Sequence, residues 1–259
     1  MADAVDVLIL AGKRPRAGTI LAAVEGDLTG RGMAVRVDWR DAPGALDAAS
    51  GSPLVIHRGL APRTLAALAA RGPGRIVNPP GACLAAADRG AALAALRSAS
   101  IPVPDSLVTG EWIDVRRWAG GGPAFLKAAS GAAGRGVGVV ALPHGAPPDP
   151  PMPGPWHVER ALPADGVDRK LYVVGDRVFG LLKPWPRDGG PGEAFDPPAP
   201  LADLARAAGR ALGLEIYGVD LVGRADRFGI VDVNPFPGFR GVAGAADAVA
   251  DHIAARAAR

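Results

Sequence analysis

The pattern of apolar segments changes once along the chain, and this change limits the folds that the chain can adopt. In the first third, short apolar runs typical of buried strands alternate with helical segments. Such alternation predicts a parallel sheet covered by helices. After the middle of the chain, strand segments follow one another directly, at 156–162, 169–174 and 178–183, which predicts an antiparallel sheet. We therefore expect an α/β (α+β) chain with one parallel and one antiparallel part.

Proline-rich segments mark the expected boundaries. The breaker Asn78-Pro79-Pro80-Gly81 ends the parallel part, and Ile101-Pro102-Val103-Pro104 stops the alanine-rich segment 82–99, which we expect to be one helix. The proline cluster 143–155 predicts a flexible connection. The expected units are residues 1–80, 81–155 and 156–259.

Composition excludes several classes of protein. The formal net charge is only +3 over 259 residues and the basic residues are scattered, so nucleic acid is not an expected partner. No apolar run reaches the roughly 18 residues of a membrane helix, so we expect no membrane association and a cytoplasmic location. A single cysteine, Cys83, and four histidines without ligand spacing exclude a disulfide framework and structural zinc. The expected assembly is a monomer or homodimer.

Lys127 stands directly before a glycine-rich segment between two expected strands. Strands 124–128 and 137–142 flank the loop 130–136, whereas dinucleotide and P-loop fingerprints require such a loop to open a helix. Backbone N–H groups of a hairpin loop can cover phosphates, and a lysine on the preceding strand can reach them. A plain glycine-rich turn is the alternative interpretation.

Three oxygen-bearing side chains interrupt apolar segments near the carboxyl end. Asp232 and Asn234 are two residues apart on one expected strand, so they share a face. If segment 223–228 turns symmetrically about Asp226, Asp220 stands opposite Asp232 and the two carboxylates repel. Mg²⁺ relieves such repulsion, because it prefers one or two carboxylates, an amide oxygen and phosphate oxygens. Solvated hairpin acids are the alternative, although a charge that interrupts an apolar run is costly there.

The order and spacing of these motifs resemble the ATP-grasp superfamily. The resemblance covers the chain from about Asn78 to the end, and each motif alone is weak whereas the ordered set is specific. Two branches are similar: the ribosomal-protein glutamate ligases with their carboxylate–amine ligase relatives, and the inositol trisphosphate 5/6-kinases. The motifs are Asp88-Arg89, Lys127 with the glycine loop, 158–162, 166–175, Asp220 and 232–239.

The resemblance implies an ATP-grasp fold with an N-terminal parallel-sheet domain, a small lid subdomain and a C-terminal antiparallel subdomain. It also implies ATP and Mg²⁺ as cofactors, with a small molecule or a peptide as acceptor. The implied nucleotide contacts are Arg89, Lys127, Gly134, Arg135, Gly136, Glu159, Arg160 and Leu162. The implied metal ligands are Asp220, Asp232 and Asn234, and the implied catalytic residues are Lys170 and Arg240.

Three functions are compatible with this resemblance. We prefer an ATP-dependent carboxylate–amine ligase, with a small-molecule kinase that phosphorylates a hydroxyl as the alternative and a nucleotide-binding module without catalysis as the third. Arg89 stands where many relatives have a lysine, Asp232 replaces the glutamate of most ligases, and Lys170 matches the kinases. A kinase pocket would be lined by several cations; the candidates for lining the acceptor pocket are Lys13, His57, Arg58 and Lys183.

Overall fold

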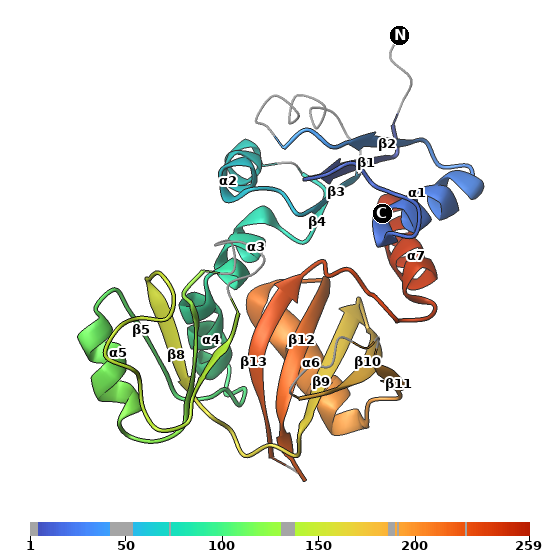
Figure 1. Ribbon diagram of the computed structural model, residues 1–259. Coiled ribbons are helices and arrows are strands. Elements are labelled where there is room, and N and C mark those ends of the chain that lie inside the picture. The colour runs from blue at the N-terminus through green and yellow to red at the C-terminus, as the bar shows by residue number, and fades with distance from the viewer. Residues whose placement is uncertain are drawn as a thin grey trace.

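The computed structural model describes residues 5–41, 54–72, 74–130, 138–185, 190, 192–225 and 227–259. The described part of the chain contains three sheets with helices packed on them (Figure 1). None of the described helices combines the length and the apolar character needed to cross a bilayer.

The first sheet is parallel, as the strand–helix alternation predicts, and we call it the parallel sheet. Its strand order is β2-β1-β3-β4, and all five residues of β1 are buried because a central parallel strand is covered on both faces. Its elements are β1 (Val7–Ala11), α1 (Ile20–Gly30), β2 (Val35–Asp38), β3 (Leu54–Arg58), α2 (Pro62–Arg71) and β4 (Ile76–Val77).

The segment expected as one helix over 82–99 is two helices, α3 (Pro80–Ala87) and α4 (Arg89–Ser98). Asp88 separates them with an extended backbone, and its side chain accepts a hydrogen bond from the Ala91 N–H at 3.0 Å. The prediction of a continuous helix was wrong because an aspartate can cap a new helix instead of continuing the old one. The break places Arg89 at the start of α4.

The second sheet is small and antiparallel, with strand order β5-β8-β6-β7, and we call it the small sheet. It has its own core, which includes Val115, Leu126, Trp156 and Val158. The expected boundary at 155/156 is wrong, because β8 pairs with β5 and β6 and not with the strands that follow it. The elements are β5 (Ser106–Thr109), α5 (Trp112–Ala119), β6 (Ala124–Ala128), β7 (Val140–Leu142) and β8 (Trp156–Arg160).

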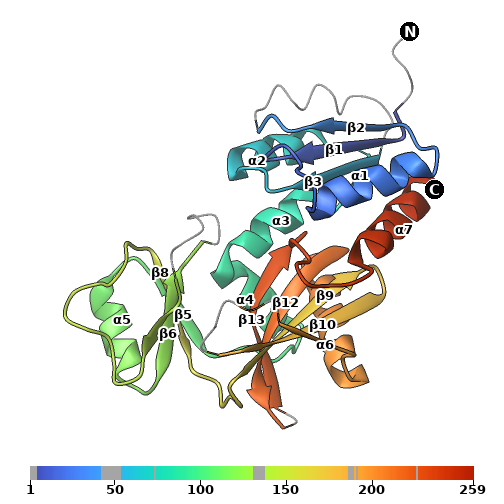
Figure 2. The same cartoon turned by 45° about the vertical axis from the view of Figure 1, so that its right-hand side comes forward.

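The third sheet has the strand order β11-β10-β9-β12-β13, and we call it the five-stranded sheet. Helices α3 and α4 share its core with α6, so they belong to this unit and not to the small sheet as expected. Helix α7 packs beside α1 (Figure 2). The elements are β9 (Val167–Val174), β10 (Arg177–Pro184), β11 (Glu193–Phe195), α6 (Ala199–Leu212), β12 (Ile216–Arg224), β13 (Arg227–Pro235) and α7 (Ala245–Ala257).

Asn78 joins the parallel sheet to the five-stranded sheet. It is fully buried with a left-handed backbone (φ 57°), which asparagine tolerates better than most residues. Its side-chain N–H donates to Ile216 O at 2.6 Å, and its side-chain oxygen accepts from the N–H groups of Glu215 and Ile216 at 2.8 and 3.0 Å. His57 Nε2 lies 2.7 Å from the Asn78 carbonyl oxygen. This buried network fixes the end of β4 to the start of β12.

Candidate functional site

Two carboxylates face each other on the β12–β13 hairpin. Asp220 and Asp232 are directly paired in the ladder, which is the register that the sequence predicts. Asn234 lies two residues further along β13, and its side-chain N–H donates to Asp232 Oδ2 at 3.1 Å. The three oxygen-bearing side chains therefore lie together on one face of the hairpin.

The register arises differently from the symmetric turn that we expected. Arg224 pairs with Arg227 at the turn, and a bulge between Asp220 and Leu221 shifts the ladder by one residue. The bulge adds one residue, Val231, to β13 and so restores the pairing at Asp232. The Val231 carbonyl accepts a hydrogen bond from Lys127 Nζ at 3.1 Å, so the bulge provides an acceptor for a residue of the small sheet.

Each of the two carboxylates has a cation beside it. Lys170 on β9 is directly opposite Asp220 in the ladder and forms an ion pair with Asp220 Oδ2. Arg89, at the start of α4, places its Nε 3.7 Å from Asp232 Oδ1, while its Nη1 donates to Ala128 O at 2.8 Å. Lys170 and Arg89 were both expected near phosphates, and both lie at the predicted metal position.

The donor set fits Mg²⁺. Burial raises the pKa of Asp232, and the nearby charge of Asp220 raises it further, so the pair favours the arrival of positive charge. No cluster of three or more His, Cys, Asp or Glu side chains suited to a metal occurs among the described residues. Two carboxylates with an amide oxygen suit Mg²⁺, which keeps several waters and shares phosphate oxygens, and suit zinc poorly.

A second ion pair lies within the small sheet, between neighbouring strands β6 and β8. Lys127 Nζ is 2.5 Å from Glu159 Oε1, and both residues are buried, with exposed fractions of 7% and 2%. Burial raises the pKa of Glu159, whereas the Lys127 ammonium lowers it. Lys127 also bonds the Val231 carbonyl, so it links the small sheet to the five-stranded sheet. Lys127 therefore lies beside the segment of β13 that carries Asp232, and its contact with phosphates stays a prediction.

His157 is a site residue that the sequence analysis missed. It is fully buried opposite Lys127 in the β6–β8 ladder, and its Nδ1 lies 3.8 Å from Glu159 Oε2. Burial lowers the pKa of His157 to about 4, and the charges of Lys127 and Arg89 contribute, so the ring is neutral near pH 7. Its position two residues before Glu159 on a strand was the available signal, because such residues share a face.

Arg160 turns away from this cluster. Its guanidinium donates to the carbonyls of Gly122 and Trp118 at 2.8 and 2.5 Å and lies 3.9 Å from the centre of the Trp118 ring. The Arg160 side chain is therefore occupied within the small sheet, whereas the adenine contact expected of residues 159–162 involves their backbone and stays a prediction. Leu162 follows β8, and Arg240 is exposed in the segment between β13 and α7. Gly134, Arg135 and Gly136 lie outside the described residues.

The four residues expected to line the acceptor pocket lie in different surroundings. Arg58, at the end of β3, donates from Nε to Phe236 O at 3.0 Å, and so holds the segment that follows Asn234. His57 is buried in the Asn78 network and has a structural role. Lys13 is exposed after β1, and Lys183 is half-buried on β10.

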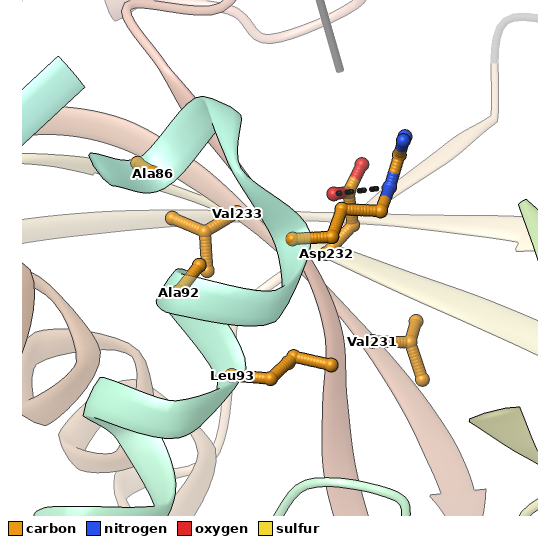
Figure 3. A pocket seen from close by; sticks show the side chains of 7 residues that line it. Ala86, Ala92, Leu93, Val231, Asp232 and Val233 are labelled. Carbon is orange, nitrogen blue, oxygen red and sulfur yellow. Dashed lines mark ion pairs between the residues drawn. The ribbon is translucent and has the colours of Figure 1, made fainter. Parts of the chain in front are cut away.

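A small pocket lies beside the hairpin, between β13 and the helices α3 and α4 (Figure 3). Asp232 and Arg89 form its polar part, and the dashed line in Figure 3 marks their ion pair. The remaining lining residues are apolar: Ala86, Ala92, Leu93, Val231 and Val233. Of the three predicted metal ligands, Asp232 lines this pocket, whereas Asp220 and Asn234 do not.

Solved structures share this arrangement of three sheets. An ATP-grasp protein with a RimK domain from Sphaerobacter thermophilus superposes with a TM-score of 0.74 over 98% of this chain and 100% of its own, at 23% identity. The chain has the ATP-grasp fold. The ATP-grasp ligase PsnB, solved with precursor peptide PsnA2 and AMPPNP, gives a TM-score of 0.71 at 20% identity over 99% of both chains.

Sequence comparison matches shorter stretches. Residues 187–255 match the family described as the inositol 1,3,4-trisphosphate 5/6-kinase ATP-grasp domain. A probable alpha-L-glutamate ligase of Xanthomonas campestris is 38% identical over 91 residues. This match covers 31% of the chain and 31% of that ligase. The ATP-grasp fold therefore extends over the whole described chain, while the sequence likeness is local.

Proposed function

We propose that this chain is an ATP-grasp enzyme that uses Mg-ATP to phosphorylate a carboxylate, which an amine then attacks. The observation that carries the proposal is the meeting of the Asp220–Asp232 pair with Lys127 from the small sheet, through the carbonyl of Val231. A carboxylate pair for a cation and a buried lysine for phosphates are the two groups that phosphoryl transfer from Mg-ATP needs.

The chain's own residues supply the positioning. Asp220, Asp232 and the amide oxygen of Asn234 would hold Mg²⁺, which supplies charge neutralisation to the β- and γ-phosphates. Lys127 would release Glu159 and bind the phosphates, and Arg89, at the start of α4, would bind the same polyphosphate. Both cations are present at the site before the nucleotide arrives, so little reorganisation of charge is needed.

Lys170 is the proposed catalytic residue for the transferred group. Its ammonium forms an ion pair with Asp220 here; in the metal-loaded site the Lys170 ammonium would instead bind the γ-phosphoryl group or the acceptor carboxylate. Arg240, exposed after β13, is the second residue proposed to bind the acceptor. Attack of the carboxylate oxygen on the γ-phosphorus breaks the bond to the β-phosphate oxygen and gives an acyl phosphate and ADP. The amine then displaces phosphate at the acyl carbon and forms the amide.

The acceptor is proposed to be a peptide or a small molecule. PsnB and the macrocyclase MdnC of Microcystis aeruginosa, which shares the fold at a TM-score of 0.71, were both solved with precursor peptides. PsnB is an ATP-grasp ligase, and the Xanthomonas campestris protein that matches over 91 residues is a probable alpha-L-glutamate ligase. These likenesses favour amide formation over transfer to a hydroxyl.

The test is an ADP-release screen in which carboxylate–amine pairs, including glutamate with peptide carboxyl ends, run beside polyols and sugar phosphates. Phosphorus NMR of each active reaction then identifies the product. A ligase gives inorganic phosphate only when both carboxylate and amine are present. A stable phosphate ester would identify a kinase instead, and no ADP release with any acceptor, together with no nucleotide binding, would exclude both.

A further inference from the structure

The buried polar atoms around Lys127 are not all satisfied. Neither ring nitrogen of His157 has a hydrogen-bond partner, and Glu159 Oε2 and Arg89 Nε also lack one. These four atoms account for most of the unpartnered buried side-chain atoms among the described residues. Such atoms are costly when they stay unpaired, so a cluster of them at one place points to a state in which they are paired.

Glu159 has one donor in use and a second donor within reach. Its Oε1 is held by Lys127 Nζ at 2.5 Å, while its Oε2 faces His157 Nδ1 at 3.8 Å. His157 and Glu159 are two residues apart on β8, so both side chains project from the same face of the small sheet. A shift of about 1 Å would bring Oε2 and Nδ1 to hydrogen-bond distance.

His157 can act as this donor without adding charge. Burial and the cations Lys127 and Arg89 lower its pKa to about 4, and a neutral imidazole keeps one N–H group. The charged groups that act on this pair come from three other elements: Lys127 on β6, Asp88 and Arg89 at the start of α4, and Asp232 on β13.

We propose that His157 is the alternative hydrogen-bond donor of Glu159, and that it positions this carboxylate when Lys127 turns to the nucleotide phosphates. The inference rests on the proposed function, since it requires that Lys127 bind a nucleotide. Glu159 is too buried to lose its partner without replacement. Without His157, Glu159 either keeps Lys127 or takes a proton from solvent. His157 is thus a positioning residue that acts through Glu159.

The test compares three variants in nucleotide binding, measured by calorimetry with AMPPNP and Mg²⁺ at pH 7. His157→Leu removes the donor and should weaken affinity about tenfold or more. His157→Asn places an amide N–H near the position of Nδ1 and should bind within about threefold of wild type. His157→Gln carries its amide further out, toward the position of Nε2, and should bind as weakly as the leucine variant. His144→Leu, at an exposed histidine, is the control.

Proton uptake gives a second readout that a merely structural role would not change. The same titrations are repeated in two buffers of different ionisation enthalpy. Wild type should take up close to no protons on binding, because His157 replaces Lys127. The leucine variant should take up as much as one proton per nucleotide, because Glu159 must become neutral when Lys127 leaves.

The outcomes separate the two proposals. A wild-type protein that binds no nucleotide contradicts the proposed function itself. If the wild type binds and the leucine variant matches it in both affinity and proton uptake, the donor exchange is wrong. If the leucine variant fails to fold, the asparagine and glutamine variants decide: equal affinities in these two would overturn the inference.

Discussion

Lys170 on β9 and Asp220 on β12 are directly paired across the ladder and joined by an ion pair. Asp220 is at the same time directly paired with Asp232 on β13. The ammonium of Lys170 therefore supplies part of the positive charge that Mg²⁺ would bring to the two carboxylates. We therefore expect the effect of Mg²⁺ on the stability of the protein to depend on Lys170.

Replacing Lys170 with methionine should lower the melting temperature of the metal-free protein, because the two facing carboxylates then lose a cation. Millimolar Mg²⁺ should recover part of that loss and raise the melting temperature more than in wild type. Turnover should fall at least about a hundredfold, since one removed charge donor commonly costs that much. Thermal unfolding with and without Mg²⁺ checks the first two effects, with Lys183→Met as control. An unchanged Mg²⁺ response would show that Lys170 does not neutralise this site.

Asp232→Asn should abolish Mg²⁺-dependent nucleotide binding while leaving the metal-free protein as stable as wild type or slightly more stable. Burial and the charge of Asp220 raise the pKa of Asp232 because they disfavour its ionised carboxylate, and the uncharged asparagine removes this unfavourable charge. Calorimetry with Mg-AMPPNP and a melting curve in chelator measure the two effects. Asp203→Asn, at an exposed acid on α6, serves as the matched control. Full Mg²⁺-dependent binding in the Asp232 variant would remove this residue from the metal site.

Lys127→Met should lose nucleotide binding and also about 3–5 kcal/mol of stability at neutral pH, because it leaves Glu159 buried without its cation. The double variant with Glu159→Gln should recover the stability and not the binding. Melting curves and nucleotide titrations of the two variants measure these effects. A fully stable single variant would contradict the ion pair.

In the double variant Lys127→Met/His157→Leu, which also removes the neutral donor of Glu159, the stability loss should depend on pH. Burial raises the pKa of Glu159 above 4.5, and removal of the lysine removes the main cause that lowers it. In the window above the ordinary carboxyl pKa, the folded variant then binds one proton more than the unfolded chain, so its stability falls as pH rises. The difference from wild type should be small near about pH 4 and grow toward neutral pH. Denaturant unfolding across this range measures it, and a constant difference would exclude Glu159 as the cause.

Arg160→Met should destabilise the small sheet by about 1–3 kcal/mol and leave nucleotide affinity unchanged. Its guanidinium binds Trp118 and Gly122 and lies on the Trp118 ring, away from Lys127. Unfolding and binding measurements on one preparation separate the two effects. Arg117→Met, at a neighbouring exposed arginine, should change neither. A large loss of nucleotide affinity with normal stability would show that the Arg160 side chain belongs to the nucleotide site.

Local patterns predicted what depends on local geometry. The parallel strands, the face shared by Asp232 and Asn234, and the pair Asp220–Asp232 all follow from side-chain alternation and strand order. The pair was nevertheless predicted from a symmetric turn, whereas a tighter turn and the bulge at Val231 produce it together. A bulge has no signal in the periodicity of a single strand.

The remaining errors concern long-range pairing. Strand β8 looks like the first of three consecutive strands, but it pairs with β5 and β6, which precede it by many residues. The chain leaves one sheet at Arg160 and enters the next at Val167 without a change in composition.

The buried network at Asn78 joins two of the three sheets directly. Because this asparagine bonds the end of β4 to the start of β12, the parallel and five-stranded sheets are fixed to each other. The chain crosses to and from the small sheet through segments 99–105 and 161–166. Lys127 binds Glu159 within the small sheet and the Val231 carbonyl of the five-stranded sheet, so binding of a nucleotide phosphate by Lys127 would change a contact between these two sheets.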